Sequence, residues 1–185
     1  MLNHTTQYFI KQISVSEYLA HYRDAERFGA CCKSCSNYAK SWACPPFDFD
    51  VMQRLSQYRN LLLIVCKITP MDTALPLTNS RELIRPERIN LEKKLLDLEK
   101  QYNGLSAAYV GSCLYCPEGT CTRANGQPCR HPELVRPSLE GYGFDIGKTT
   151  KELFGMDLLW GKEGHLPEYL LLVCGFFHNE SHIDF

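Results

Sequence analysis

Short apolar runs along the chain alternate with segments whose apolar residues recur at helical spacing. Runs typical of strands lie at 8–13, 60–68, 105–112 and 168–177. The stretch "DLLW" at 157–160 is a shorter candidate strand. The segments between these runs predict helices, so strands and helices are expected to alternate along the chain.

The first predicted helix follows directly on the first strand. Ser14 and Glu17 have the spacing of a capping box, in which a hydroxyl and a carboxylate satisfy the early amides of a helix. Gly29 suits the end of this helix. The first cysteine-rich stretch is therefore expected in a loop just after a helix.

Three more helices are predicted further along the chain. Asp48 or Asp50 is suited to cap a short helix. The longest helix is expected from Glu87 to Tyr102, with Gly104 at its end. Asp145 is suited to cap the last helix.

The order of these elements predicts an α/β or α+β fold. We expect a single domain over residues 1–185, with a sheet of about four or five strands covered by helices and with two cysteine-rich loops. Hydrophobic residues make up 44% of the 185 residues. A chain of this size and composition can build a core that does not need disulfides.

Composition narrows the class of protein. The N-terminus lacks the basic start and apolar segment of a signal peptide, and the longest apolar runs are too short to span a bilayer. We therefore expect a cytoplasmic protein with no membrane partner, in which clustered cysteines are more often metal ligands than disulfides. The net charge is −1 and no basic block stands out, which argues against binding to nucleic acid.

One set of four cysteines follows the third predicted strand in a C-x2-C-x4-C-x7-C pattern. Its members are Cys113, Cys116, Cys121 and Cys129. A C-x2-C turn lets two thiolates approach one metal from a single tight loop, and two more cysteines complete fourfold sulfur coordination. The pattern predicts a metal site.

An earlier set of four cysteines consists of Cys31, Cys32, Cys35 and Cys44. Cys32 and Cys35 form another C-x2-C pair. Cys44 precedes Pro45, and ferredoxin-type ligand runs also end in Cys-Pro. We expect either Cys31 or Cys32 to be a small buried residue and not a ligand.

The spacing of the cysteines also bears on the identity of the metal. Zinc sites and iron–sulfur clusters both use four cysteines. Zinc knuckles usually pair two C-x2-C elements, whereas Cys121 and Cys129 stand alone at irregular spacing. Aromatic residues nearby, such as Trp42 and Tyr115, could shield a cluster from water. We therefore favour [4Fe-4S] clusters, with zinc as the alternative.

Charged residues directly after Cys129 form a second candidate group. Arg130, Arg136 and Glu140 are concentrated there. In one interpretation they bind a cofactor, an anionic ligand or a partner. In the other, Arg136 pairs locally with Glu140.

Four further residues have ligand chemistry but unsuitable surroundings. Cys66 and Cys174 lie within apolar runs, so we expect buried, inert thiols. His178 and His182 are four residues apart in a polar run near the C-terminus, where we expect an exposed tail and no metal site.

The segments "CKSCSNYAKSWACPP" and "GSCLYCPEGTCTRANGQPCRHPELVRPSLEGYGFDI" resemble the two conserved elements of a known family. This family is the group of predicted metal-binding proteins called domain of unknown function 2284. The resemblance implies metal binding and no particular activity. The ligands that it implies are Cys35 and Cys44 with Cys31 or Cys32, followed by all four cysteines of the later set.

Three functions are compatible with these patterns. An iron–sulfur protein would pass electrons to a redox partner protein. A small iron–sulfur reductase would act on an anionic substrate beside Arg130, Arg136 and Glu140. A zinc-stabilised interaction module would have no redox role. The sequence contains no phosphate-binding glycine loop or nucleophile elbow, so electron transfer is favoured and the question of an enzymatic activity stays open.

Overall fold

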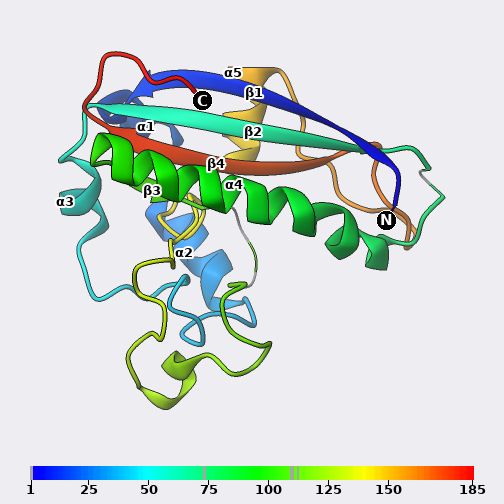
Figure 1. Ribbon diagram of the computed structural model, residues 1–185, viewed down its shortest axis with the longest axis horizontal. Coiled ribbons are helices and arrows are strands. Elements are labelled where there is room, and N and C mark those ends of the chain that lie inside the picture. The colour runs from blue at the N-terminus through cyan, green and yellow to red at the C-terminus, as the bar shows by residue number, and fades with distance from the viewer. Residues whose placement is uncertain (1, 73, 109–110, 112) are drawn as a thin grey trace.

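The computed structural model describes residues 2–72, 74–108, 111 and 113–185. Within these residues, four antiparallel strands form one sheet in the order β1-β2-β4-β3 (Figure 1). The strands are β1 (His4–Ser14), β2 (Asn60–Pro70), β3 (Leu105–Ala107) and β4 (Leu170–His178). This arrangement confirms the predicted mixed fold with a sheet of about four or five strands.

Five α-helices accompany the sheet in the described part of the chain. They are α1 (Val15–Tyr22), α2 (Ala25–Lys33), α3 (Val51–Leu55), α4 (Ser80–Tyr102) and α5 (Ile146–Phe154). Two short 3-10 helices, η1 (Leu77–Asn79) and η2 (Thr122–Asn125), lie in the connections. The carboxylates of Asp50 and Asp145 accept hydrogen bonds from amides in the first turns of α3 and α5, which confirms both predicted caps.

The two central strands are covered on both faces. Leu62 and Ile64 of β2 pack against the leucines of α4, whereas Leu61 and Leu63 face the core formed with α1 and α5. Figure 1 shows α4 along one face of the sheet and α5 on the other. Because both faces are buried, β2 reads as a continuous apolar run and not as an alternating one. None of the described helices is both long enough and apolar enough to cross a membrane.

The first predicted helix is in fact two helices. Arg23 is extended and forms a β-bridge with Phe144, and the Asp24 amide donates to the Gly143 carbonyl at 2.9 Å. The Asp24 carboxylate then accepts from the Arg27 amide at 3.0 Å and begins α2. Gly29 therefore lies inside α2 and does not end a helix, which corrects the prediction.

The long helix also differs from its predicted bounds. α4 begins at Ser80 and continues through Pro86, and its first turn is held by Leu83, which is 1% exposed. At its C-terminal end, Asn103 adopts the left-handed conformation expected of Gly104. Residues 157–160 have no regular secondary structure, so the strand predicted there is absent.

The glycine at 104 is explained by packing. A Cβ atom there would lie 2.3 Å from the Phe176 ring and 2.5 Å from the Phe177 carbonyl oxygen. At Gly29, in contrast, an added Cβ would meet nothing within 4 Å. A larger side chain therefore fits at position 29 but not at position 104.

Replacing each glycine by alanine tests these assignments. Gly29→Ala should raise the free energy of unfolding by roughly 0.5–1 kcal/mol, because alanine is the better helix former. Gly104→Ala should lower it by about 1–3 kcal/mol through overpacking. Urea unfolding measures both values, and a destabilising Gly29→Ala would restore Gly29 as a helix terminator.

Candidate metal centre

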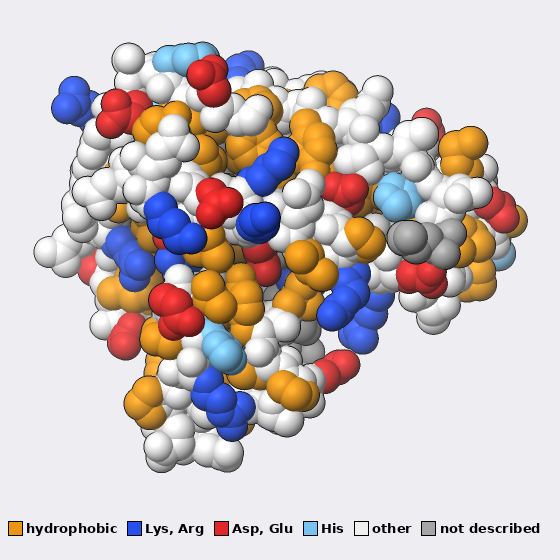
Figure 2. Space-filling model, viewed as in Figure 1, with side chains coloured by type: hydrophobic (Ala, Val, Ile, Leu, Met, Phe, Trp, Pro, Cys, Tyr) orange, Lys and Arg blue, Asp and Glu red, His pale blue; other side chains and the backbone are white. Residues whose placement is uncertain are grey.

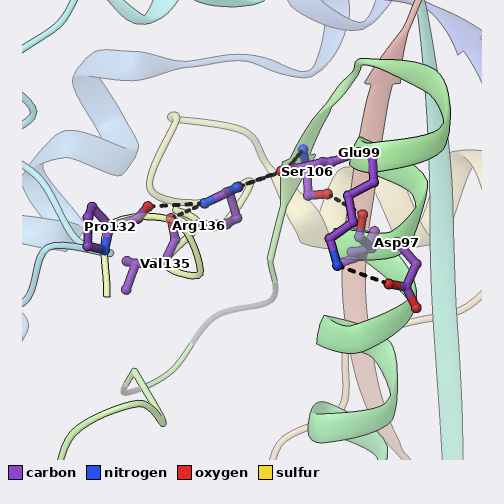
Figure 3. Close-up of polar contacts among 8 residues, drawn as sticks. Asp97, Glu99, Ser106, Pro132, Val135 and Arg136 are labelled. Atoms are coloured by element: carbon purple, nitrogen blue, oxygen red, sulfur yellow. Dashed lines mark hydrogen bonds and ion pairs between the residues drawn. The ribbon is translucent and has the colours of Figure 1, made fainter. Parts of the chain in front are cut away.

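The later cysteine segment leaves the sheet after β3 and returns before α5, and one carboxylate holds both of its ends. Glu99 in α4 accepts from the Ser106 amide at 2.7 Å and from Arg136 Nε and Nη2 at 2.7 and 2.5 Å (Figure 3). Ser106 lies in β3 and Arg136 lies just beyond the cysteines. The Ala108 amide also donates to the Pro137 carbonyl at 2.9 Å. The two ends of the segment are therefore fixed side by side.

The electrostatics of this anchor favour the ion pair. Burial raises the pKa of the Glu99 carboxyl, but the hydrogen bonds from Arg136 and from the Ser106 amide outweigh burial, and the net pKa is lowered. The hydrogen bonds that Arg136 donates to Glu99 raise the pKa of Arg136 in turn. The two side chains are only 14% and 18% exposed, so solvent screens the pair weakly.

The earlier cysteines begin within α2 and continue into the turns after it. Cys31 and Cys32 lie in its last turn, and the Cys35 amide donates to the Cys32 carbonyl at 3.0 Å. Cys31 and Cys35 are exposed, whereas Cys32 and Cys44 are half-buried. The expectation that Cys31 or Cys32 is buried is therefore wrong. Burial raises the pKa of both Cys32 and Cys44, and the neighbouring thiols raise it further.

An open cavity of about 1050 Å³ lies beside the later cysteines. Cys113, Cys116, Cys121 and Cys129 all line it. Several of their sulfurs accept hydrogen bonds from N–H groups. The His131 amide donates to Cys129 Sγ at 3.4 Å, and Arg130 Nη1 donates to Cys116 Sγ at 3.9 Å. Burial raises the pKa of Cys113, and the charge of Glu92 and the nearby thiols raise it further, although a hydrogen bond from the Tyr115 amide opposes this.

Arg123 joins the two cysteine segments into one lobe, which we call the cysteine lobe (31–46 and 113–131). Its guanidinium donates to the carbonyl of Ser41 at 2.7 Å and to the carbonyls of Cys44 and Pro46. It also lies over the Trp42 ring at 5.0 Å from the centroid. Figure 1 shows the two segments beside each other on the same side of the sheet. Nothing in the sequence distinguished Arg123 from other arginines.

A second contact supports this docking. Trp42 Nε1 donates to the Gln127 carbonyl at 3.2 Å. Trp42 was expected near the cysteines, and it lines the same cavity as the later set. The earlier segment therefore supplies part of the wall around the later thiols.

The remaining candidate ligands lie elsewhere. Cys66 and Cys174 are fully buried in the sheet, which confirms the expectation for both, and burial raises the pKa of the Cys66 thiol to about 12. His178 is buried at the end of β4 and stacks on Phe176, so the prediction of an exposed tail is wrong there. His182 is exposed and pairs with Asp184.

The charged residues after Cys129 do not converge on one pocket. Arg136 pairs with Glu99, and not with Glu140. Arg130 stays beside Cys116 and donates to the Thr120 carbonyl at 3.0 Å. Glu140 has a buried Oε2 without a hydrogen bond to the described residues, and burial raises the pKa of this carboxyl to about 7. Arg130 is the one of these three that donates a hydrogen bond to a cysteine sulfur, Cys116 Sγ.

The described residues contain no group of three or more His, Cys, Asp or Glu side chains already gathered for a metal ion. The donors nevertheless have the required chemistry. All ten cysteines are free, and eight of them lie in the two segments of the lobe. Free thiols beside N–H donors are a suitable ligand set for zinc or for iron–sulfur clusters.

Comparison with known proteins supports this chemistry. The family model of a predicted metal-binding protein (DUF2284) matches residues 19–173. The matched range contains both cysteine segments, which confirms the resemblance based on their motifs. No curated protein and no solved structure matches the chain.

Removing the charge of Glu99 tests the anchor of the later segment. Glu99→Gln should lower the free energy of unfolding by about 3 kcal/mol at neutral pH, because it leaves Arg136 partly buried without its counterion. The folded-state pKa of Glu99 is lowered, so its stabilisation is present above the unfolded value near pH 4.3 and is lost as the pH falls through the folded value. Urea unfolding along a pH series measures the difference between the two proteins.

Asp97→Asn is the matched control. Asp97 pairs with Lys100 at 3.5 Å, but both side chains are more than half exposed, so this variant should change stability little. Equal losses in Glu99→Gln and Asp97→Asn, or a difference that persists in acid, would contradict the assigned role of Glu99.

Removing the guanidinium of Arg123 tests the junction of the two segments. Arg123→Met should loosen the earlier segment, because three carbonyls lose their donor. Trypsin should then cleave after the exposed Lys40 several-fold faster, with little change in the global unfolding midpoint. Arg59→Met, at an exposed position outside the lobe, is the control. Unchanged cleavage in Arg123→Met would mean that other contacts hold the segments together.

Proposed function

The chain belongs to the family of predicted metal-binding proteins that carry domain of unknown function 2284, and from this membership we propose that its cysteine lobe binds iron–sulfur clusters of the [4Fe-4S] type. One observation carries the proposal. Eight free thiols lie in two sets of four, on segments that contact each other through Arg123 and Trp42. Cysteine thiolates are the protein ligands that such clusters use.

The N–H groups near the sulfurs support a cluster. The amide of His131 and the guanidinium of Arg130 each donate towards a thiol of the later set. Hydrogen bonds to sulfur stabilise negative charge and so tune the reduction potential of a bound cluster. Trp42 and Tyr115 line the same cavity, where their rings would shield part of a bound cluster from water.

The thiols must lose their protons to act as ligands. Burial raises the pKa of Cys32, Cys44 and Cys113, so these three are neutral thiols in the metal-free chain at neutral pH. Metal binding is therefore coupled to release of their protons. The charge of Arg123 opposes the rise in the pKa of Cys44, and Arg130 Nη1 lies 3.9 Å from Cys116 Sγ, so both guanidinium groups would stabilise thiolate charge.

Electron transfer is the role that we assign to the lobe. A bound iron–sulfur cluster supplies one-electron chemistry. Cys31 and Cys35 are exposed, so a cluster held by the earlier set would lie close to the surface, where a redox partner protein can approach. The half-buried later set would hold the better shielded cluster.

Metal analysis of cysteine variants tests this proposal. Anaerobically purified protein should contain iron and sulfide and should absorb visible light. Cys116→Ser should remove much of the bound iron, because the later set is anchored at both ends by Glu99 and loses little entropy on binding. Cys31→Ser and Cys32→Ser, taken singly, should remove less, because these adjacent residues can substitute for each other.

The buried cysteines supply matched controls. Cys66→Ala and Cys174→Ala should leave the iron content unchanged, since both thiols lie within the sheet. Equal losses in Cys116→Ser, Cys31→Ser and Cys32→Ser would contradict the ranking of the two sets. Zinc as the bound metal, without visible absorption, would overturn the iron–sulfur assignment.

A further inference from the structure

The cavity beside the later cysteines extends to α4, and the part of its lining that α4 contributes is basic. The basic side chains that line it are Lys40, Arg81, Arg85 and Arg88. Among the described lining residues, Glu118 alone is acidic. The whole chain has a net charge of −1, so this excess of positive charge is a local feature of the cavity. Figure 2 shows Lys and Arg side chains gathered beside the recess between α4 and the lower loops.

The three arginines form one stripe on α4. Arg81, Arg85 and Arg88 have the spacing i, i+4, i+7, which places their side chains on a single face of a helix. This face borders the cavity that the four later cysteines also line. A ligand in the cavity can therefore contact the arginine stripe and lie beside the thiols at the same time.

Stability alone does not account for Arg81 and Arg85 of this stripe. Like charges at i, i+4 spacing repel each other and destabilise a helix. Arg81 pairs with Glu118 at 3.8 Å, but both side chains are more than 80% exposed, so this pair is weak. Arg85 makes no ion pair with the described residues. An anionic ligand would offset the mutual repulsion.

The other side chains of the cavity indicate the rest of the ligand. Trp42, Ile84, Leu171 and Leu172 contribute apolar surface to the same lining. Pockets for small organic molecules combine such apolar surface with a few charged groups that fix orientation. The volume of about 1050 Å³ suits a ligand of that size. An inorganic ion would leave the apolar surface unused.

We infer that this cavity binds a small organic anion, with its carboxylate or phosphate group on the arginine stripe and its apolar body against Trp42. Arginine suits both groups, because its planar guanidinium donates two parallel hydrogen bonds to either. Binding of the anion does not depend on the proposed function. Only the role of the ligand, as a substrate or effector of the metal centre, rests on that function. The inference also moves the expected anion site from Arg130, Arg136 and Glu140 to α4.

Two probes of the same size test the inference on the full chain purified anaerobically. Benzoate and phenyl phosphate carry the two candidate groups on one aromatic ring, and benzyl alcohol is the neutral control. In a Trp160→Phe background, Trp42 is the single tryptophan, so NMR of its indole signals reports binding in the cavity. Both anions, or one of them, should shift the signals in a saturable way. The stronger binder identifies the anionic group.

The matched variants are Arg85→Met and Lys93→Met, which both remove an exposed positive charge from α4. Arg85→Met should raise the Kd of the preferred anion about tenfold, as expected for the loss of one charge-assisted hydrogen bond. Lys93 does not line the cavity, so Lys93→Met should have little effect. Equal effects of the two variants, no binding of either anion, or equal binding of benzyl alcohol would overturn the inference.

Metal content measured on the same samples separates the two proposals. Anion binding by protein that lacks iron would support the anion site and contradict the iron–sulfur assignment. Iron-containing protein that binds neither anion would leave that assignment intact and overturn the anion site.

Discussion

The carboxylate of Glu99 is the constraint on which the cysteine lobe depends most. It accepts from the Ser106 amide at one end of the later segment and from Arg136 at the other. A long loop that leaves a sheet and returns loses conformational entropy when its two ends are held together. Glu99 holds them from the last turns of α4, whose leucines are buried against the sheet. The core thereby fixes the origin of the thiols without contributing a ligand.

The rest of the lobe follows from this anchor. With the ends of the later segment fixed, Arg123 can reach into the earlier segment and hold three of its carbonyls. The earlier segment has its own anchor, where Arg23 and Asp24 pair with residues 143–144. Two loops that are far apart in sequence thus meet with four thiols each. In this account the sheet orders the lobe only in part, and a bound metal supplies the remaining free energy.

Local chemistry made much of the fold predictable. The apolar runs of β2 and β4, the caps at Asp50 and Asp145, and the buried Cys66 and Cys174 all follow from short-range patterns. The break between α1 and α2 does not, because the bridge from Arg23 to Phe144 is a tertiary contact. The Glu99–Arg136 pair joins residues 37 positions apart, and the hydrogen bonds of Arg123 reach further along the chain. A single sequence does not show that such distant residues are in contact. The i, i+4, i+7 spacing of the α4 arginines is visible in the sequence. Their role is indicated only by the cavity beside them.

Hydrogen exchange of the metal-free and metal-loaded protein tests the central claim most directly. The account predicts that metal slows exchange at amides in 31–46 and 113–131, while the amides of β2 and β4 stay equally protected in both forms. Loss of protection in β2 and β4 without metal would mean that the sheet does not fold independently of the lobe. Unchanged exchange throughout the lobe would mean that the cysteines do not form the metal site.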